Sequence, residues 1–257
     1  MQNYSVSIIL TIHNKQDMIE KVFNSIVENK SEVTKQIIVV FDGCSDNSEK
    51  IIDSICNKQQ INVEKIHTPD IFELQANNAG LKLSTCDYSI LIQDDVIITE
   101  KDFDQRLIKP LIMFDDIFAV SGRNAHNIYY NSINMGYKDM TGPEVDSDRN
   151  IFYVRSVINR GPLAFDNKVI RELNFFNEQF SPNAYDDMDI CFRAYKILNK
   201  KCGSYRVGFE SKPEWGTGRQ KNQNLHAWSH KKNAIILLLN HRETIENVTI
   251  IEDRVLL

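Results

Sequence analysis

The first half of the chain alternates strand-like apolar runs with helical patterns, and this alternation constrains the fold more than any other feature of the sequence. The strand-like runs occupy residues 6–12, 36–42, 61–67 and 88–93. Apolar residues at helical spacing occupy residues 19–27, 46–56 and 73–83 between these runs. Such alternation is typical of parallel β-α-β units. The sequence therefore predicts an α/β fold with a mostly parallel central sheet flanked by helices.

The composition bounds the size and class of the protein. The chain has 257 residues, of which 42% are hydrophobic and 25% charged, and this suits one domain with a substantial core. The formal net charge is -5 without a dense block of Lys and Arg, so nucleic acid is not an expected partner. The 5 cysteines are scattered and lack Cys-x-x-Cys spacing, which indicates reduced thiols instead of a disulfide frame or a zinc site.

The chain shows no sign of secretion or membrane spanning. Its first residues lack the basic region and apolar stretch of a signal peptide. The apolar run at residues 234–239 is far shorter than the roughly 20 residues that a membrane-spanning helix needs. We expect a cytoplasmic protein, with peripheral contact at the inner face of a membrane left open. Residues 230–245 read as an amphipathic C-terminal helix, for which core packing or a homodimer contact is favoured over membrane docking.

Polar residues follow three of the strand-like runs, at residues 11–14, 41–48 and 93–96. Open α/β sheets bind ligands outside the carboxyl ends of their strands, so these segments are expected to converge. Asp94 and Asp95 are two like charges at one such end, and a divalent cation could neutralise their repulsion. An exposed acidic pair without a metal is the alternative that the spacing alone leaves open.

The second half of the chain is less regular. Residues 122–150 are polar, rich in Asn and Tyr and weakly periodic, so we expect a long loop excursion there. Strand pattern returns at residues 151–158, and helical patterns follow around residues 167–173 and 183–199. The last of these begins with three acids, which could simply stabilise a helix N-terminus through the helix dipole.

Six segments carry a more specific signal when they are taken in order. They read VSIILTIHN, IIVVFDGCSDNS, QANNAGL, LIQDDV, NRGPLAFDNKVIRELNFFNEQF and DDMDICFRAYKIL. Together, over about residues 6–206, they resemble the inverting family 2 glycosyltransferases with a GT-A fold. The resemblance implies a single domain over residues 1–257, with a nucleotide-sugar-binding half (1–100), an acceptor-binding half (101–220) and a C-terminal helical extension (221–257). It also implies transfer of one sugar from a UDP- or dTDP-linked donor to a hydroxyl of a glycan or lipid-linked glycan.

The resemblance places the donor beside the first four segments. The implied donor-binding residues are Thr11, His13, Asn14, Asp42, Asn78, Gly80 and Asp94. His13 stands where an aromatic ring often stacks on the base, and Asp42 matches an acid that accepts a hydrogen bond from the base or ribose. Simpler readings stay open: a solvated His13, a turn-forming Asp42, and helix packing for Asn78 and Gly80.

The resemblance also assigns the metal and the general base. Asp95 matches the acid that binds Mg²⁺ or Mn²⁺, hard cations that stabilise the charge of a departing nucleoside diphosphate. Asp187 matches the base that deprotonates the acceptor hydroxyl. Asp186, beside it, can raise the pKa of its neighbour because like charges disfavour ionisation.

The acceptor site is implied by the later segments. Gly161, Pro162 and Leu163 match the loop that receives the acceptor, with turn formation as the simpler reading. Trp215 could pack on a sugar face, although a buried core position is the more ordinary one for Trp.

Some positions depart from the family pattern. Asn77 replaces a frequent Arg that can contact the diphosphate, and Arg123 or Arg219 could supply this charge instead. The family's His near the end of the catalytic domain has no clear counterpart, although His226 lies downstream. Two rival functions stay open: a catalytically idle sugar-nucleotide-binding module, and a nucleotidyltransferase, whose usual Gly-rich basic phosphate loop is missing.

Overall fold

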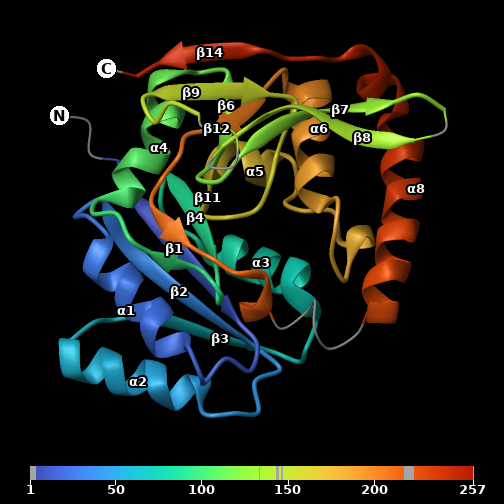
Figure 1. Ribbon diagram of the computed structural model, residues 1–257. Coiled ribbons are helices and arrows are strands. Elements are labelled where there is room, and N and C mark those ends of the chain that lie inside the picture. Colours follow the sequence, from blue (N-terminus) through green and yellow to red (C-terminus); the bar gives the residue numbers. More distant parts are fainter. Residues whose placement is uncertain (1–3, 133, 143–144, 146, 217–222, 257) are drawn as a thin grey trace.

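The central sheet runs in the strand order β14-β9-β12-β6-β11-β4-β1-β2-β3 (Figure 1). The structure, a computed structural model, describes residues 4–132, 134–142, 145, 147–216 and 223–256. The strands of this sheet are β1 (Val6–Ile12), β2 (Thr34–Asp42), β3 (Glu64–Thr68), β4 (Tyr88–Gln93), β6 (Ile117–Ser121), β9 (Ile151–Arg155), β11 (Leu163–Asp166), β12 (Lys201–Ser204) and β14 (Glu252–Val255). Strands β1, β2, β3 and β4 pair in parallel, as the sequence predicts. Strand β11 runs antiparallel between β4 and β6, which makes the sheet mixed.

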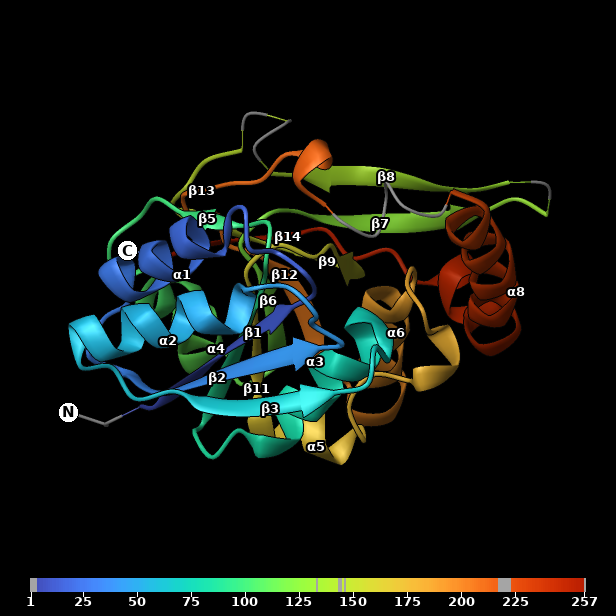
Figure 2. The same ribbon diagram turned by 90° about the horizontal axis from the view of Figure 1, so that it is seen from below.

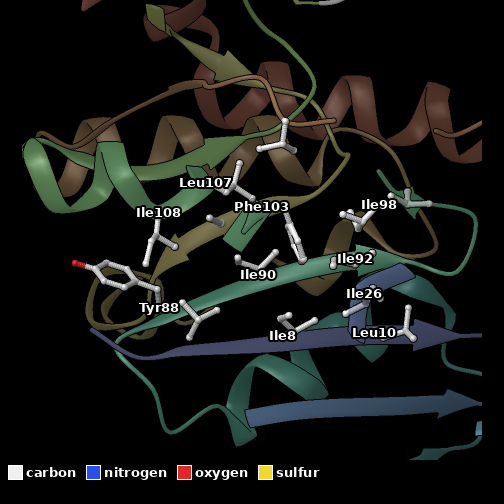
Figure 3. Packing of buried hydrophobic residues seen from close by; sticks show 14 of the residues in the cluster. Ile8, Leu10, Ile26, Tyr88, Ile90, Ile92, Ile98, Phe103, Leu107 and Ile108 are labelled. Atoms are coloured by element: carbon white, nitrogen blue, oxygen red, sulfur yellow. The ribbon is translucent and has the colours of Figure 1, made fainter. Parts of the chain in front are cut away.

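Helices cover both faces of this sheet (Figure 2). They are α1 (Ile19–Asn29), α2 (Ser48–Gln59), α3 (Phe72–Leu83), α4 (Phe103–Met113), α5 (Asn167–Glu172), α6 (Asp186–Leu198) and α8 (Gln223–Asn247). The described residues also form the short 3-10 helices η2 (Glu178–Phe180) and η3 (Pro213–Trp215). Because successive side chains of a strand point to opposite faces, Ile8 and Leu10 pack toward α1 and α4, while Ile9 packs toward α3. Each face of the sheet therefore has its own hydrophobic core. Figure 3 shows the core on the side of α1 and α4, in which Phe103 and Leu107 of α4 face Ile90 of β4.

The segment over residues 122–150 corrects the sequence prediction of a loop excursion. It forms a hairpin of β7 (Ala125–Tyr130) and β8 (Met135–Thr141), joined by β10 (Val157–Ile158) into a second sheet. The first four residues of β7 are buried. One of them is Asn127, whose side-chain amide donates to the carbonyl oxygen of Ile250, and this bond satisfies a polar group that hydropathy alone would place outside. A third, two-stranded sheet joins β5 (Ile97–Ile98) to β13 (Phe209–Glu210).

The C-terminal helix α8 is longer than the sequence prediction and packs on the core through one face. Buried Asn233, Leu237, His241 and Ile245 recur along that face, and Asn233 donates to the carbonyl oxygens of Phe180, Asn183 and Ala184. The expected core packing of this helix is therefore confirmed. Throughout the described part of the chain, no helix has the length and apolar content needed to cross a bilayer.

Candidate active site

The carboxyl end of β4 meets the loop that follows β1. The backbone N–H of His13 donates to Oδ2 of Asp94 at 3.0 Å, and Nζ of Lys15 lies 3.8 Å from Oδ1 of the same carboxylate. Burial raises the pKa of Asp94 to about 6, against the opposing effect of Lys15. The predicted convergence of these two strand ends is thus present in the structure.

Asp95 has the environment expected of a cation ligand. Its Oδ1 is buried and has no hydrogen-bond partner among the described residues. Burial raises the pKa of this carboxyl group, whereas the charges of Lys15 and Arg123 lower it. A buried carboxylate oxygen without a donor is costly unless a cation satisfies it, so Asp95 fits a hard divalent ion such as Mg²⁺ or Mn²⁺.

A second group of possible metal ligands lies at the end of β2. His13, Asp42 and Asp70 place one ligand atom each within 4.8 Å of one another. Nδ1 of His13, however, lies 2.6 Å from the carbonyl oxygen of Asp42, so this nitrogen must carry the proton. Asp42 Oδ1 already accepts from Thr68 Oγ1 at 2.7 Å and from Ile71 N at 2.8 Å. These contacts suit a preformed polar site for a base or ribose better than a cation site.

His13 is held in one orientation by its neighbours. With the proton on Nδ1, its Nε2 accepts from the side-chain amide of Asn14 at 3.4 Å. Asn14, at φ 48°, in turn accepts from the backbone N–H of Ser45 at 2.8 Å. The loops after β1 and β2 therefore lock together, and the imidazole is partly exposed at 33% of its side chain.

Three implied donor-binding residues instead have structural contacts in this fold. Thr11 is buried, and its hydroxyl donates to Asn77 Oδ1 at 2.8 Å. Asn78 donates to the carbonyl oxygen of Phe176 and accepts from its N–H, so its amide is used in holding that loop. A Cβ at Gly80 would lie 2.4 Å from Ile9, which means that the glycine lets α3 pack on β1. The contacts of Asn78 and Gly80 agree with the simpler reading of helix packing, and their donor contact stays a prediction.

A continuous chain of polar contacts joins the end of β4 to the start of α6. Gln93 Nε2 donates to Glu73 Oε1 at 2.8 Å, and Glu73 Oε2 lies 2.7 Å from Arg160 Nη1. Arg160 Nη2 then donates to Oδ2 of Asp186, the first residue of α6. The residue beside Asp94 is thus linked through two side chains to the residue beside Asp187. Parts of the chain far apart in sequence form one site.

Asp187 directly follows Asp186, the residue at which that chain of contacts ends. Its Oδ1 accepts from the backbone N–H of Met188 at 2.9 Å, which orients the carboxylate. Burial raises the pKa of Asp187 to about 7, followed by the repulsion from Asp186, while Arg160 opposes both. Ala184 and Tyr185, just before the helix, have φ values of 78° and 67°, a left-handed backbone that costs free energy in non-glycine residues and is common at functional sites.

Asp189 has a structural role, in contrast to its neighbours. Its Oδ2 accepts from Arg193 Nε at 2.7 Å and its Oδ1 lies 2.8 Å from His241 Nε2 of α8. Arg193 also donates to the carbonyl oxygens of Leu173 and Phe175. This network fixes α6 against α8 and the preceding loop.

The turn that was expected to receive the acceptor lies next to Arg160. Gly161 and Leu163 line a small cavity together with Glu73 and Arg160. The carbonyl oxygen of Pro162 accepts from the N–H of Gly122 at 2.8 Å. A Cβ at Gly161 would lie 3.0 Å from the Cβ of Arg123, so this turn and Arg123 are in close contact.

The segment around η3 lies against Lys15 and Asp95, close to the carboxyl end of β4. Lys15 Nζ donates to the carbonyl oxygen of Trp215. A Cβ at Gly216 would lie 3.3 Å from Asp95 Oδ2. Trp215 is only partly buried and has Lys212 over its ring at 5.2 Å, so the expectation of a core Trp is wrong. Arg219, the other cation proposed for the diphosphate, lies outside the described residues.

His226 lies close to the segment that precedes α6. Its Nδ1 lies 3.3 Å from Asn183 Nδ2, just before α6, and its ring packs edge-on against His230 at 4.3 Å between centroids. His230 in turn packs edge-on against Tyr185. His226 is therefore placed near the residues that precede α6.

Two residues that bridge the site escape sequence reasoning. Glu73 reads as an ordinary first-turn acid of a helix, and Arg160 precedes the Gly161-Pro162 turn without any pattern of its own. Their charges become informative only when α3 and α6 are known to face each other. The weak signal in the sequence is a charged residue directly before an apolar, turn-forming motif.

The comparison with solved structures defines the fold class. GalNAc-T7, solved with UDP, GalNAc and Mn²⁺, aligns with a TM-score of 0.68 at 12% identity, over 83% of this chain and 45% of that one. The mannosyltransferase PcManGT from Pyrobaculum calidifontis, in complex with GDP-Man and Mn²⁺, aligns at 0.63 and 13%, over 95% and 65%. Glucosyl-3-phosphoglycerate synthase from Mycobacterium tuberculosis, solved with Mn²⁺, UDP and phosphoglyceric acid, aligns at 0.58 and 14%, over 91% and 78%. At such identities these likenesses establish the GT-A fold, and the chain spans about half the length of GalNAc-T7.

The sequence profile described as "Glycosyl transferase family 2" matches residues 7–173. The chain therefore belongs to glycosyl transferase family 2. No curated protein sequence matches it.

Proposed function

We propose that this protein is an inverting glycosyltransferase that moves one sugar from a nucleoside-diphosphate sugar, UDP- or dTDP-linked, to a hydroxyl of a glycan or lipid-linked glycan. The observation that carries the proposal is the polar chain Gln93-Glu73-Arg160-Asp186. It brings the acidic end of β4 and the acidic start of α6 to one site. A donor at the first and an acceptor at the second would then meet across that site.

The proposed chemistry assigns the base to Asp187. The acceptor hydroxyl gives its proton to this carboxylate as its oxygen attacks the anomeric carbon from the face opposite the diphosphate, and so inverts that carbon. A base with a pKa of about 7 is half ionised near neutral pH and therefore both available and strong enough to accept the proton. Gly161, Pro162, Leu163 and Trp215 remain our proposed acceptor contacts.

The donor would bind at the other end of the site. His13 and Asp42 face the nucleoside, Asp94 the ribose or sugar, and Lys15 and Arg123 add positive charge near the diphosphate. Asp95 would hold the Mg²⁺ or Mn²⁺, as its unpartnered oxygen favours. When bound, the cation neutralises the charge that develops on the departing diphosphate.

A thermal-shift screen tests the nucleotide site. UDP, dTDP and GDP, each tested with and without Mn²⁺, should raise the Tm most for the correct base, and the shift should be small when the metal is absent. At a ligand concentration of about 100 times Kd the expected stabilisation is about 2.7 kcal/mol, or roughly 5–10 °C for a domain of this size. If none of the three nucleotides gives a metal-dependent shift in Tm, this result would count against a nucleotide-sugar site.

Turnover separates the proposed enzyme from its two rivals. With the sugar-linked form of the best nucleotide, a glycosyltransferase transfers the sugar slowly to water and faster to an acceptor glycan, and it releases the nucleoside diphosphate in both cases. An idle module binds the nucleotide without any release. A nucleotidyltransferase instead consumes a triphosphate and releases pyrophosphate.

A homodimer, a membrane contact and a cytoplasmic location stay predictions. The outward face of α8 is the surface on which the first two can be tested, since Trp228 is 54% exposed, Ile235 60% and Leu239 79%. We expect Leu239→Glu to weaken association through this face. Light scattering measures the dimer, and co-sedimentation with anionic vesicles measures the membrane contact. Equal behaviour of the variant and the wild type in both measurements would exclude this face of α8 as a dimer or membrane contact.

A further inference from the structure

Arg160 occupies a position that the proposed mechanism does not use directly. It lies in the turn between β10 and β11, with 18% of its side chain exposed, between Glu73 of α3 and Asp186 of α6. Asp186 is 1% exposed, and a buried carboxylate needs a partner to remain charged. The planar guanidinium offers N–H groups in two directions and can hold two carboxylates at once, which a lysine ammonium does with much less directional control.

The charge of Arg160 also acts on Asp187. Arg160 lowers the pKa of Asp186 and of Asp187, while burial raises both. The groups that interact electrostatically with Asp187 come from several elements: Asp186 and Cys191 of α6, Tyr185 just before it, Tyr137 of β8 and Arg160 of the turn, while Glu73 of α3 acts on Arg160 and Asp186. Arg160 is the cation in this set.

We propose that Arg160 is a positioning residue: by bridging Glu73 and Asp186 it fixes the first turn of α6 against the donor side and keeps Asp187 available as a base. This inference rests on the proposed function, because it assumes that Asp187 accepts the acceptor's proton. The bridge from α3 to α6 is what makes the role specific to Arg160, because its guanidinium reaches Glu73 on one side and Asp186 on the other. The turn that carries Arg160 lines a small cavity together with Glu73. Gly161 and Leu163 of the same turn line that cavity but bear no charge.

The pH dependence of turnover distinguishes this role from a merely structural one. A base works when it is deprotonated, so wild-type activity should fall as the pH drops below about 7. Arg160→Met removes the cation, raises the pKa of Asp187 and should move this acid limb to higher pH. A shift of one pH unit lowers the rate at pH 7 by roughly fivefold, because the base is already only half ionised there, and lets the rate recover in alkaline buffer. Arg160→Lys keeps the charge, so its acid limb should stay near that of the wild type although its maximal rate falls.

The opposite shift is expected from the partner residue. Asp186→Asn removes the repulsion that raises the pKa of Asp187, so the acid limb should move to lower pH. The double variant Arg160→Met/Asp186→Asn leaves no buried unpaired charge between these two positions, and it should restore both folding and an acid limb near that of the wild type. It therefore provides a measurement even where Arg160→Met alone is too unstable to purify.

The experiment measures Mn²⁺-dependent hydrolysis of the best nucleotide-sugar from the donor screen, against pH, for the wild type and these four variants. Opposite shifts for Arg160→Met and Asp186→Asn support the inference. An unmoved acid limb in Asp186→Asn, or an equal loss at every pH in Arg160→Met, overturns it. A wild type that binds nucleotide but hydrolyses no donor overturns the proposed function itself. This result differs from a failure of the Arg160 inference, because an inactive wild type gives no pH profile with which the variants could be compared.

Discussion

Asp187→Asn should reduce sugar transfer by about 10²- to 10⁴-fold, the range expected for loss of a general base. The amide has nearly the same size and can still accept the Met188 N–H at its oxygen, so the first turn of α6 should keep its geometry. It cannot, however, take the proton from an acceptor hydroxyl at any accessible pH. The kcat should therefore fall while the Tm shift given by nucleoside diphosphate and Mn²⁺ stays near that of the wild type.

Asp189→Asn is the matched control, because it makes the same chemical change two residues further along α6. This carboxylate is paired with Arg193 and His241 and has no role in the proposed chemistry. Its loss should lower the free energy of unfolding and leave the activity of the folded enzyme largely intact. Wild-type turnover by Asp187→Asn, or an equal loss of activity in both variants, would remove Asp187 as the base.

The parallel half of the fold was predictable because its signals are local. Strands β1 and β4 begin and end where the apolar runs predict, since a buried parallel strand needs a continuous apolar segment and its polar end marks the sheet edge. The third strand was placed too early: it was predicted over residues 61–67, but β3 begins at Glu64 and is only partly buried, because it is the edge strand and lacks a fully apolar pattern.

The second half was less predictable because it buries polar residues, some of which are satisfied by distant partners. The buried positions of β7 include His126 and Asn127, residues that read as loop in the sequence, and Asn127 finds partners in Ile250 and Ser156. The predicted strand at residues 151–158 splits between two sheets, as β9 and β10. These features depend on tertiary contacts that periodicity does not record.

The residues of the candidate site also differ in whether the sequence alone could predict them. Its motif acids were predictable because each one stands at the end or the start of an element, whereas Glu73 and Arg160 gain their meaning only from the approach of α3 to α6. Asn78 and Gly80 show the converse case. They lie in a recognisable motif, and the structure adds contacts with Phe176 and Ile9 that the motif does not predict.

Asp95→Asn should weaken metal-dependent nucleotide binding by about 100-fold or more, since even residues that only orient a metal ligand are worth 10- to 100-fold in affinity. Its buried Oδ1 lacks a donor within the described part of the structure, and the neutral amide is a poorer ligand for a hard cation than the carboxylate. The Tm shift given by UDP or dTDP with Mn²⁺ should shrink to the small shift given by the nucleotide alone, and transfer should be lost with it.

The control for the metal is Asp70→Asn, which tests the rival cluster at the end of β2. Asp70 is 60% exposed and lies within reach of His13 and Asp42, but the His13 proton on Nδ1 and the two donors on Asp42 oppose a cation there. Asp70→Asn should therefore leave the Mn²⁺-dependent part of the shift unchanged. If it abolishes that part while Asp95→Asn preserves it, the cation binds beside β2, and the diphosphate must be placed along that edge of the sheet instead of against Asp95.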